Sequence, residues 1–290
     1  MKFSVTSVVL PDLDVLETCR LLQRLGFEGV EWRVRYTPPD AKGYSMWGAH
    51  KSDLSPDNIG RRAKEVRRIT EDHGLAMPIV ASNARADELE TIRKLAEGAA
   101  LLGNVPVRVG APRGYDRTRP YAALYDEAID AYGKALEVLK AAGQTAIIEI
   151  HGGTIMVSAS LAHRIVSRFA PADIGVIYDA NNMAKDGFET FRIGMELLGP
   201  YLKHCHAGGW KPAPAERRPD GTLTWKYEGC DLSDSILDIP QFIADLQAVG
   251  YGGLVSIEDF RAMDYEQKLA PQLAYLRRLA GRQAGRQAGR

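Results

Sequence analysis

Thr145-Ala-Ile-Ile-Glu-Ile-His-Gly-Gly153 has the pattern of a short apolar β-strand that ends in an acid, an imidazole and two glycines. A carboxylate that closes a buried strand is costly to desolvate unless a positive charge meets it. Three more apolar runs end in an acid or an imidazole: Val176-Ile-Tyr-Asp179, Leu202-Lys-His-Cys-His206 and Leu254-Val-Ser-Ile-Glu-Asp259. Together the four runs supply Glu149, Asp179, His206 and Glu258, a set that one divalent metal ion could join.

Strand-like runs alternate with helical segments along the whole chain. We expect strands at residues 3–9, 29–33, 76–81, 105–109, 145–150, 174–178, 202–206 and 253–257. We expect helices before Gly26, from Ser55-Pro56 to Gly74, and at 87–102, 121–142, 158–169, 188–198, 240–249 and 265–279. This alternation predicts an α/β protein with a parallel sheet, a single (β/α)8 TIM barrel over residues 1–280. An open doubly wound sheet is the alternative, but Val9-Leu-Pro-Asp12 lacks its Gly-rich phosphate turn.

The connections between these segments support the barrel. The long loops follow the second and seventh strands, on the face where barrels carry their active sites, and residues 207–237 form the longest of them. After Ala280 the chain repeats Ala-Gly-Arg-Gln, and we predict that residues 281–290 form a disordered low-complexity tail.

The bulk composition narrows the class of protein. Among 290 residues, 37 Lys and Arg balance 37 Asp and Glu, so the total charge indicates no nucleic-acid partner. The 3 cysteines form no CxxC pair, which favours a reducing compartment. The N-terminus reads as a strand and not as a signal peptide, and no apolar run reaches the roughly 18 residues of a membrane span. We therefore expect a cytoplasmic protein without a membrane partner.

The strand ends also carry a family resemblance. Ile148-Glu-Ile-His-Gly-Gly153, Tyr178-Asp-Ala-Asn-Asn182, His204-Cys-His-Ala-Gly208 and the run from Gly250 to Glu258 resemble the xylose isomerase-like barrel superfamily. The chain is similar to its sugar isomerase/epimerase branch, which includes tagatose 3-epimerase types and inosose dehydratases. The resemblance implies one Mn²⁺-like ion on Glu149, Asp179, His206 and Glu258, with Mg²⁺, Co²⁺ or Zn²⁺ as alternatives. It also implies that Glu149 and Glu258 act as a base and acid pair on a sugar or keto-sugar, in a homodimer or with a second subunit.

Two positions depart from the tagatose epimerase pattern. Asn182 stands where that pattern has a histidine, and Pro212 stands where it has an arginine. Lys211 and Arg217 lie near the second position, so we expect substrate contacts that differ from those of the epimerases.

Further candidates surround the four ligands. His151 is either a second base, as suits a lyase, or a loop histidine bonded to the backbone, and His204 is expected in the core. The candidate substrate-binding residues are Glu31, Trp47, Asn182, Trp210, Lys211 and Arg261. Glu31 would touch substrate or hold a loop, Trp47 and Trp210 would stack on a sugar ring or fix their loops, and Arg261 would contact substrate or neutralise Glu258.

The expected function is thus proton transfer next to the carbonyl of a ketose or keto-sugar. The alternative is a metal-dependent lyase, a dehydratase or β-eliminating enzyme with His151 as base. A DNA-repair endonuclease of the superfamily would need more histidines on strands two to four, and a serine hydrolase would need a G-x-S-x-G turn, which is absent. A barrel kept only as a binding subunit is the non-enzyme alternative.

Overall fold

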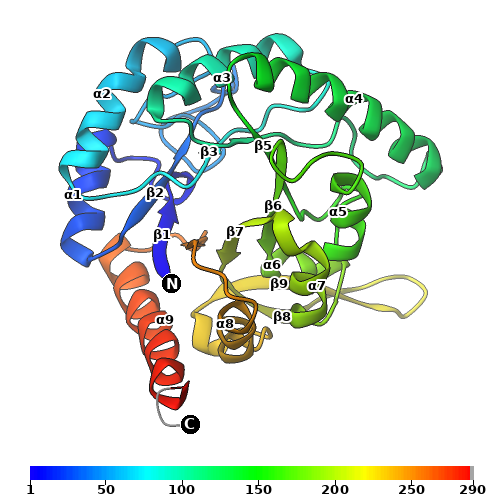
Figure 1. The fold of residues 1–290 in the computed structure, drawn as a ribbon. Helices are drawn as coiled ribbons and strands as arrows, with labels where there is room; N and C mark the ends of the chain where they lie inside the picture. Colours follow the sequence, from blue (N-terminus) through cyan, green and yellow to red (C-terminus); the bar gives the residue numbers. More distant parts are fainter. Residues whose placement is uncertain (288–290) are drawn as a thin grey trace.

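A closed barrel of parallel strands forms the centre of the molecule, and helices pack around it (Figure 1). The computed structural model describes the backbone of residues 1–287 and the side chains of residues 1–281. Within this part, the barrel strands are β1 (Lys2–Thr6), β2 (Gly29–Arg33), β3 (Val80–Ala81), β4 (Val107–Arg108), β5 (Ala146–Glu149), β6 (Ile174–Asp179), β7 (Leu202–Ala207) and β10 (Leu254–Ile257). They follow the order β1-β10-β7-β6-β5-β4-β3-β2, and each neighbouring pair is parallel. The predicted single (β/α)8 barrel is confirmed.

The helices lie between the strands along the chain and cover the outside of the barrel (Figure 1). They are α1 (Val15–Leu25), α2 (Ile59–Asp72), α3 (Leu89–Leu102), α4 (Tyr121–Ala141), α5 (Ala159–Val166), α6 (Ala180–Asp186), α7 (Phe191–Leu198), α8 (Ile239–Ala248) and α9 (Tyr265–Gln287). Short 3-10 turns occupy η1 (Ser7–Val9), η2 (Gly199–Tyr201) and η3 (Leu232–Asp234). At the start of α1, Asp14 and Glu17 form a capping box, in which each side chain accepts a hydrogen bond from the other's backbone N–H.

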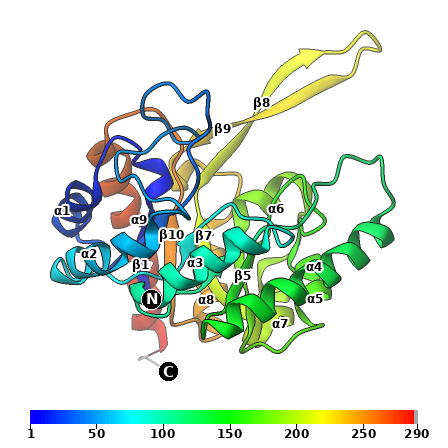
Figure 2. The same cartoon turned by 90° about the horizontal axis from the view of Figure 1, so that it is seen from above.

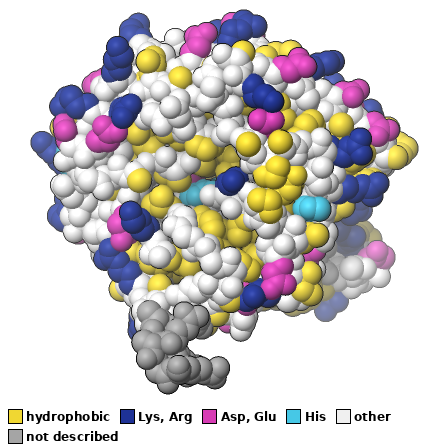
Figure 3. All heavy atoms as spheres, viewed as in Figure 1, with side chains coloured by type: hydrophobic (Ala, Val, Ile, Leu, Met, Phe, Trp, Pro, Cys, Tyr) yellow, Lys and Arg dark blue, Asp and Glu magenta, His cyan; other side chains and the backbone are white. Residues whose placement is uncertain are grey.

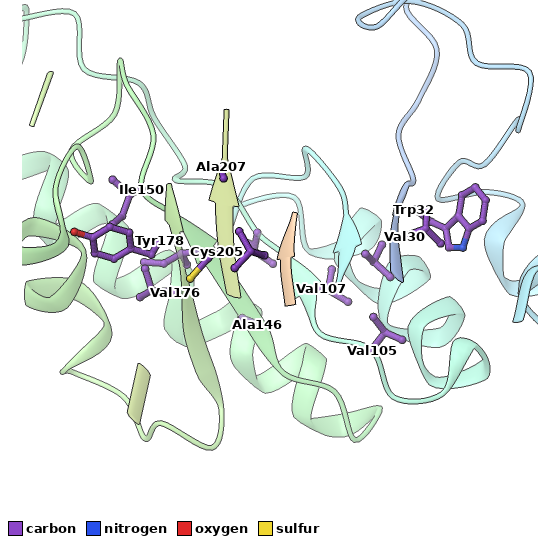
Figure 4. Packing of buried hydrophobic residues seen from close by; sticks show 14 of the residues in the cluster. Val30, Trp32, Val105, Val107, Ala146, Ile150, Val176, Tyr178, Cys205 and Ala207 are labelled. Atoms are coloured by element: carbon purple, nitrogen blue, oxygen red, sulfur yellow. The ribbon is translucent and has the colours of Figure 1, made fainter. Parts of the chain in front are cut away.

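Alternation along the strands separates two cores. One set of side chains packs outward beneath the helices, as Figure 4 shows for Val176, Tyr178 and Cys205. The other set points into the barrel, where Ile79, Ile147 and Ile177 form a small apolar cluster of their own. Because inward positions recur every second residue, the inward face of the strands also carries the polar side chains at the strand ends.

The segment from 207 to 237, which we expected to be a loop, contains a β-hairpin. Strands β8 (Gly209–Arg217) and β9 (Leu223–Cys230) pair antiparallel and project away from the barrel (Figure 2). The alternation in Leu223-Thr-Trp-Lys-Tyr227 is typical of a strand. Pro212 and Pro214 argued against a strand in the sequence, although proline is tolerated on a strand whose outer edge is unpaired.

The helices differ from the expectation in three places. The segment expected as one helix from 188 to 198 is preceded by the separate α6, which Asp179 caps. Helix α2 begins at Ile59 and not at Ser55-Pro56, because the Asn58 side chain accepts the Ser55 N–H and closes a turn there. Helix α9 continues past Leu279 to Gln287, since Ala, Arg and Gln favour helix. Residues 288–290, the end of the predicted disordered tail, lie outside the described residues.

Two observations bear on the cellular setting. Among the described residues, no helix combines the length and the apolar character that crossing a bilayer requires. Cys19, Cys205 and Cys230 are buried free thiols. The cytoplasmic location stays a prediction.

Candidate active site

The four side chains singled out at the strand ends come together at one end of the barrel. His206 Nδ1 lies 3.1 Å from Glu149 Oε1 and 3.5 Å from both Asp179 Oδ2 and Glu258 Oε1. One donor atom from each of these residues lies within 4.8 Å of the other three. The strands that bring them, β5, β6, β7 and β10, are consecutive around the barrel. We call these four residues the carboxylate cluster.

The local fold fixes the Asp179 carboxylate. Asp179 ends β6 and caps α6, so its Oδ1 accepts the backbone N–H of Asn182 at 2.8 Å. Its Oδ2 accepts the Asn182 side-chain amide at 2.7 Å. Asn182, expected to contact substrate, therefore also orients a member of the carboxylate cluster.

Glu31 is placed differently from our expectation. It is fully buried on β2, where its Oε1 lies 2.5 Å from His204 Nε2 and 3.2 Å from His206 Nε2. A carboxylate beside Nε2 favours the proton on that nitrogen, which leaves the Nδ1 lone pair directed toward the carboxylate cluster. Glu31 thus orients His206 from below and does not line the cavity described next. His204, expected in the core, is buried with it.

The electrostatics of the carboxylate cluster call for additional positive charge. Burial and the negative charges of Asp179 and Glu149 raise the pKa of Glu258 to about 8, although the positive charge of His206 opposes this shift. Burial alone would lower the pKa of His206, but Glu258 and Glu31 raise it well above its usual value. Burial alone would raise the pKa of Glu149, yet the Arg108 guanidinium and His206 hold it below its usual range. The cluster by itself therefore retains protons on His206 and Glu258 to limit its negative charge.

A divalent ion fits this donor set. Three carboxylates and one imidazole are the ligands that Mn²⁺, Mg²⁺ and related ions accept. Asp179 and His206 are almost fully buried, and the buried Glu149 carboxylate contacts Arg108 and His206. Glu31, His204 and His206 form a second group with donor atoms within 4.8 Å. In that group Glu31 Oε1 contacts His204 Nε2 directly, and none of the three residues lines the cavity described next.

A cavity of about 580 Å³ borders the carboxylate cluster. Its walls combine the cluster with aromatic, amide and basic side chains. They are Val8, Arg35, Trp47, Asn83, Arg108, Glu149, His151, Asp179, Asn181, Asn182, Lys185, Trp210, Glu258 and Phe260. On the face seen in Figure 3, hydrophobic side chains gather toward the centre and charged ones spread around the rim. A mixed apolar and polar lining is typical of a small-molecule site.

Several predicted substrate residues line this cavity. Trp47 stacks on Phe260 with ring centroids 5.3 Å apart, and Lys185 Nζ lies 3.8 Å from the centroid of the Trp210 ring. His151 also lines the cavity, and its Nδ1 donates to the Gly152 carbonyl at 2.7 Å. Since a carbonyl only accepts, Nδ1 carries a proton, and in the neutral form of the ring the lone pair is on Nε2.

Lys211 and Arg261 lie outside the cavity lining. Lys211 is exposed on the hairpin opposite Glu228. Arg261 is held by Asp259 and Asp231 through Nε and Nη2, so it does not neutralise Glu258, which was one of its two expected roles. The reason is local: Asp259 follows Glu258 directly and lies closer to the Arg261 backbone, whose N–H it also accepts.

Two arginines of the cavity wall were missed. Arg108, on β4, forms an ion pair between Nη2 and Glu149 Oε2. Arg35 follows β2, and its Nε donates to the Ala81 carbonyl at 3.2 Å. Burial, with repulsion from Arg108 and Arg33, lowers the pKa of Arg35 to about 9. The available signal was Arg108 itself, a cation inside an apolar strand, which needs a buried acid nearby.

Comparisons with known proteins agree with this geometry. The family model described as "Xylose isomerase-like TIM barrel" matches residues 19–279. A search of curated proteins gave no match. An L-ribulose 3-epimerase structure superposes with a TM-score of 0.73 at 17% identity, covering 99% of this chain and 97% of that one. The probable 3-DHS dehydratase AsbF from Bacillus anthracis gives 0.70 at 13% identity, covering 95% and 98%. The 3-keto-D-glucoside 4-epimerase YcjR from E. coli gives 0.67 at 17%, covering 96% and 99%. At these identities the likeness shows the fold alone.

Proposed function

The chain belongs to the xylose isomerase-like TIM barrel family, and we propose that it is a divalent-metal-dependent sugar isomerase or epimerase. It would move a proton on the carbon next to the carbonyl of a ketose or keto-sugar. The observation that carries this proposal is the carboxylate cluster, three acids and an imidazole within 4.8 Å, at the wall of a 580 Å³ cavity. The epimerases of similar fold support the same class of reaction.

Glu149, Asp179, His206 and Glu258 would hold the ion, which we propose to be Mn²⁺, with Mg²⁺, Co²⁺ or Zn²⁺ as alternatives. When bound, the ion supplies Lewis-acid polarisation of a substrate carbonyl and so acidifies the neighbouring C–H. Asn182 and Glu31 would hold Asp179 and His206 in place through the contacts described above.

Glu149 and Glu258 would transfer the proton. They stand on β5 and β10, the two outer strands of the run β10-β7-β6-β5, so they flank the cluster from opposite sides. A sugar between them would lose a proton to one carboxylate and gain a proton from the other carboxyl group on its opposite face. Trp47 and Trp210 would provide apolar faces for the sugar ring.

A lyase is the second candidate, and the position of His151 favours it. The His151 side chain lines the cavity, and its Nδ1 donates to the Gly152 carbonyl. In the neutral ring Nε2 would act as the base that removes a proton before a leaving group departs from the adjacent carbon. The similar fold of the probable 3-DHS dehydratase AsbF supports this second candidate.

Turnover in D₂O tests the proposal. The Mn²⁺-loaded protein is incubated with free ketoses and 3-keto-glycosides, and the products are analysed by NMR and mass spectrometry. Deuterium at the carbon next to the carbonyl, with all oxygens retained, supports an isomerase or epimerase. A product that has lost water or an aglycone supports the lyase, and absence of turnover with every metal contradicts both.

His151→Ala separates the two reactions. For an epimerase in which the two glutamates carry the proton, we expect a kcat within about threefold of the unmodified protein. For the lyase we expect a loss of about 10²-fold or more, in line with the usual contribution of a general base. His163→Ala, on α5 and outside the cavity, serves as the matched control. A His151→Ala protein that forms the elimination product at full rate rules out this histidine as base.

A further inference from the structure

With its three acids ionised, as metal binding requires, the cavity wall has no net charge of its own. Three acids and three basic residues line this wall. The acids are Glu149, Asp179 and Glu258, and the basic residues are Arg35, Arg108 and Lys185. Behind this lining the buried Glu31 and Arg33 carry opposite charges. A divalent ion on the acids would leave the wall with an excess of two positive charges. Arg35 and Arg108 are half-buried, although Lys185 is exposed, so this excess is unfavourable unless the ligand brings negative charge.

Arg35 is the basic residue with the fewest protein partners. Its Nε is held by the Ala81 carbonyl at 3.2 Å, and no acid within residues 1–281 lies within ion-pair distance of it. Arg108 and Arg33 repel it, and the more weakly acting Glu149 and Glu258 attract it only from beyond ion-pair distance. The guanidinium is therefore held at one nitrogen, and the two carboxylates that offset its charge are ones that the metal ion would use.

Arg108 and Lys185 add to the positive charge in the same cavity. Arg108 shares the single carboxylate of Glu149, which the metal ion would also use. Lys185 has no acid within ion-pair distance in the described part of the chain, and its Nζ rests on the Trp210 ring at 3.8 Å. None of these cations is thus fully neutralised once the acids bind an ion.

Arg35 and the carboxylate cluster line the same cavity but come from different parts of the barrel. Arg35 follows β2 and Arg108 is on β4, whereas the acids come from the ends of β5, β6 and β10. A sugar whose carbonyl faces the cluster would extend its other end across the cavity toward Arg35. Guanidinium groups bind carboxylates and phosphates through two parallel N–H bonds.

We propose that the substrate is an anionic keto-sugar, whose carboxylate or phosphate binds Arg35 with Arg108 beside it. This inference rests on the proposed function and narrows its substrate class. It differs from a neutral ketose only at the end of the sugar remote from the carbonyl, so ligands that differ only at that end test it.

D-Fructose, D-fructuronate and D-fructose 6-phosphate form such a series, since they share carbons 1 to 5. Calorimetric titration of each into the Mn²⁺-loaded protein should give at least about tenfold tighter binding of one anionic sugar than of fructose. Preference for fructuronate identifies a carboxylate site, and preference for the 6-phosphate identifies a phosphate site. Equal affinities, or failure of both anionic sugars to bind, overturn the proposal.

Variants of Arg35 distinguish binding of the anionic group at Arg35 from its direct attraction to the metal ion. In Arg35→Gln the ratio of anionic to neutral affinity should fall at least about fivefold, and Arg35→Lys should restore part of it. Arg218→Gln, an exposed arginine on the hairpin, should leave the ratio unchanged. An unchanged ratio in a folded Arg35→Gln protein overturns the proposal. Failure of the proposed function itself is seen earlier, as absence of Mn²⁺ binding before any sugar is added.

Discussion

The two sides of the barrel end carry opposite charge and are built differently. On one side, β5, β6, β7 and β10 each deliver one short donor side chain, and the four donors meet within 4.8 Å. On the other side, β3 and β4 are strands of two residues each, and the basic groups of Arg35 and Arg108 reach the cavity on long side chains. The first side can fix a small ion, because each donor is set by a strand end. The second can adapt to a larger ligand, which suits a role in choosing the substrate.

Asp179→Asn should separate the two sides most sharply. Asparagine preserves the helix cap of α6 but removes one negative ligand. We expect Mn²⁺ affinity to fall more than the roughly 10–100-fold that loss of an outer partner costs. Calorimetry measures it, with Asp186→Asn, an exposed acid of the same helix, as the control. Equal affinities for the two variants would remove Asp179 from the proposed ligand set.

Glu31→Gln tests the support beneath the metal side. The neutral amide still reaches His206 Nε2 but no longer attracts its proton strongly, so we expect about 10-fold weaker Mn²⁺ binding. Glu97→Gln, on the exposed face of α3, should have no effect. If Glu31→Gln instead weakened only sugar binding, the original expectation of a substrate contact would be right.

Arg108→Gln should strengthen Mn²⁺ binding, whereas Asp179→Asn and Glu31→Gln should weaken it. Removing a positive charge that pairs with Glu149 frees this carboxylate and lowers the repulsion of the ion, so we expect Mn²⁺ to bind about 3–10-fold more tightly. Arg113→Gln, an exposed arginine paired with Glu127, is the matched control. Weaker metal binding in Arg108→Gln would mean that Arg108 supports the metal ligands. The assignment of Arg108 to the substrate side of the barrel end would then be wrong.

The smallest expected effect is on stability. Because the folded pKa of Glu258, about 8, exceeds its ordinary value of 4.5, the metal-free protein should lose stability as pH rises from 5.5 to 8. The raised pKa of His206 acts in the same direction once the pH exceeds 6.5. The lowered pKa values of Glu31 and Glu149 contribute stability that is complete above about pH 5 and so constant across this range. The lowered pKa values of His50 and His204 add stability up to about pH 6.5 and offset part of the loss.

Thermal unfolding in EDTA should therefore show a Tm on the order of 5 °C lower at pH 8 than at pH 5.5. Mn²⁺ should raise the Tm more at pH 8, because binding requires the deprotonated ligands. A metal-free protein that is more stable at pH 8 would contradict the charge balance described for the carboxylate cluster.

The metal side could be predicted from the sequence because its signals are local. Each of Glu149, Asp179, His206 and Glu258 closes or follows an apolar run, and strand alternation places all four on inward positions. The barrel could be predicted from a different pattern, the alternation of strands with helices along the chain. The role of the four residues as ligands stays a prediction.

The other side depended on contacts between distant segments. The pairing of Arg108 with Glu149 follows from the register that sets Arg108 beside Ile147, and Glu31 meets His204 and His206 across the barrel. No local pattern gives either contact. The hairpin β8–β9 was missed for a different reason, since its prolines outweighed the alternation of Leu223 to Tyr227.

Anomalous diffraction at the manganese edge, from a crystal soaked in Mn²⁺, would locate the bound ion. We expect one strong peak bonded to Glu149, Asp179, His206 Nδ1 and Glu258, with Mn–O and Mn–N distances of roughly 2.0–2.3 Å. A peak on Glu31, His204 and His206 instead, or no peak at the end of the barrel, would contradict this expectation.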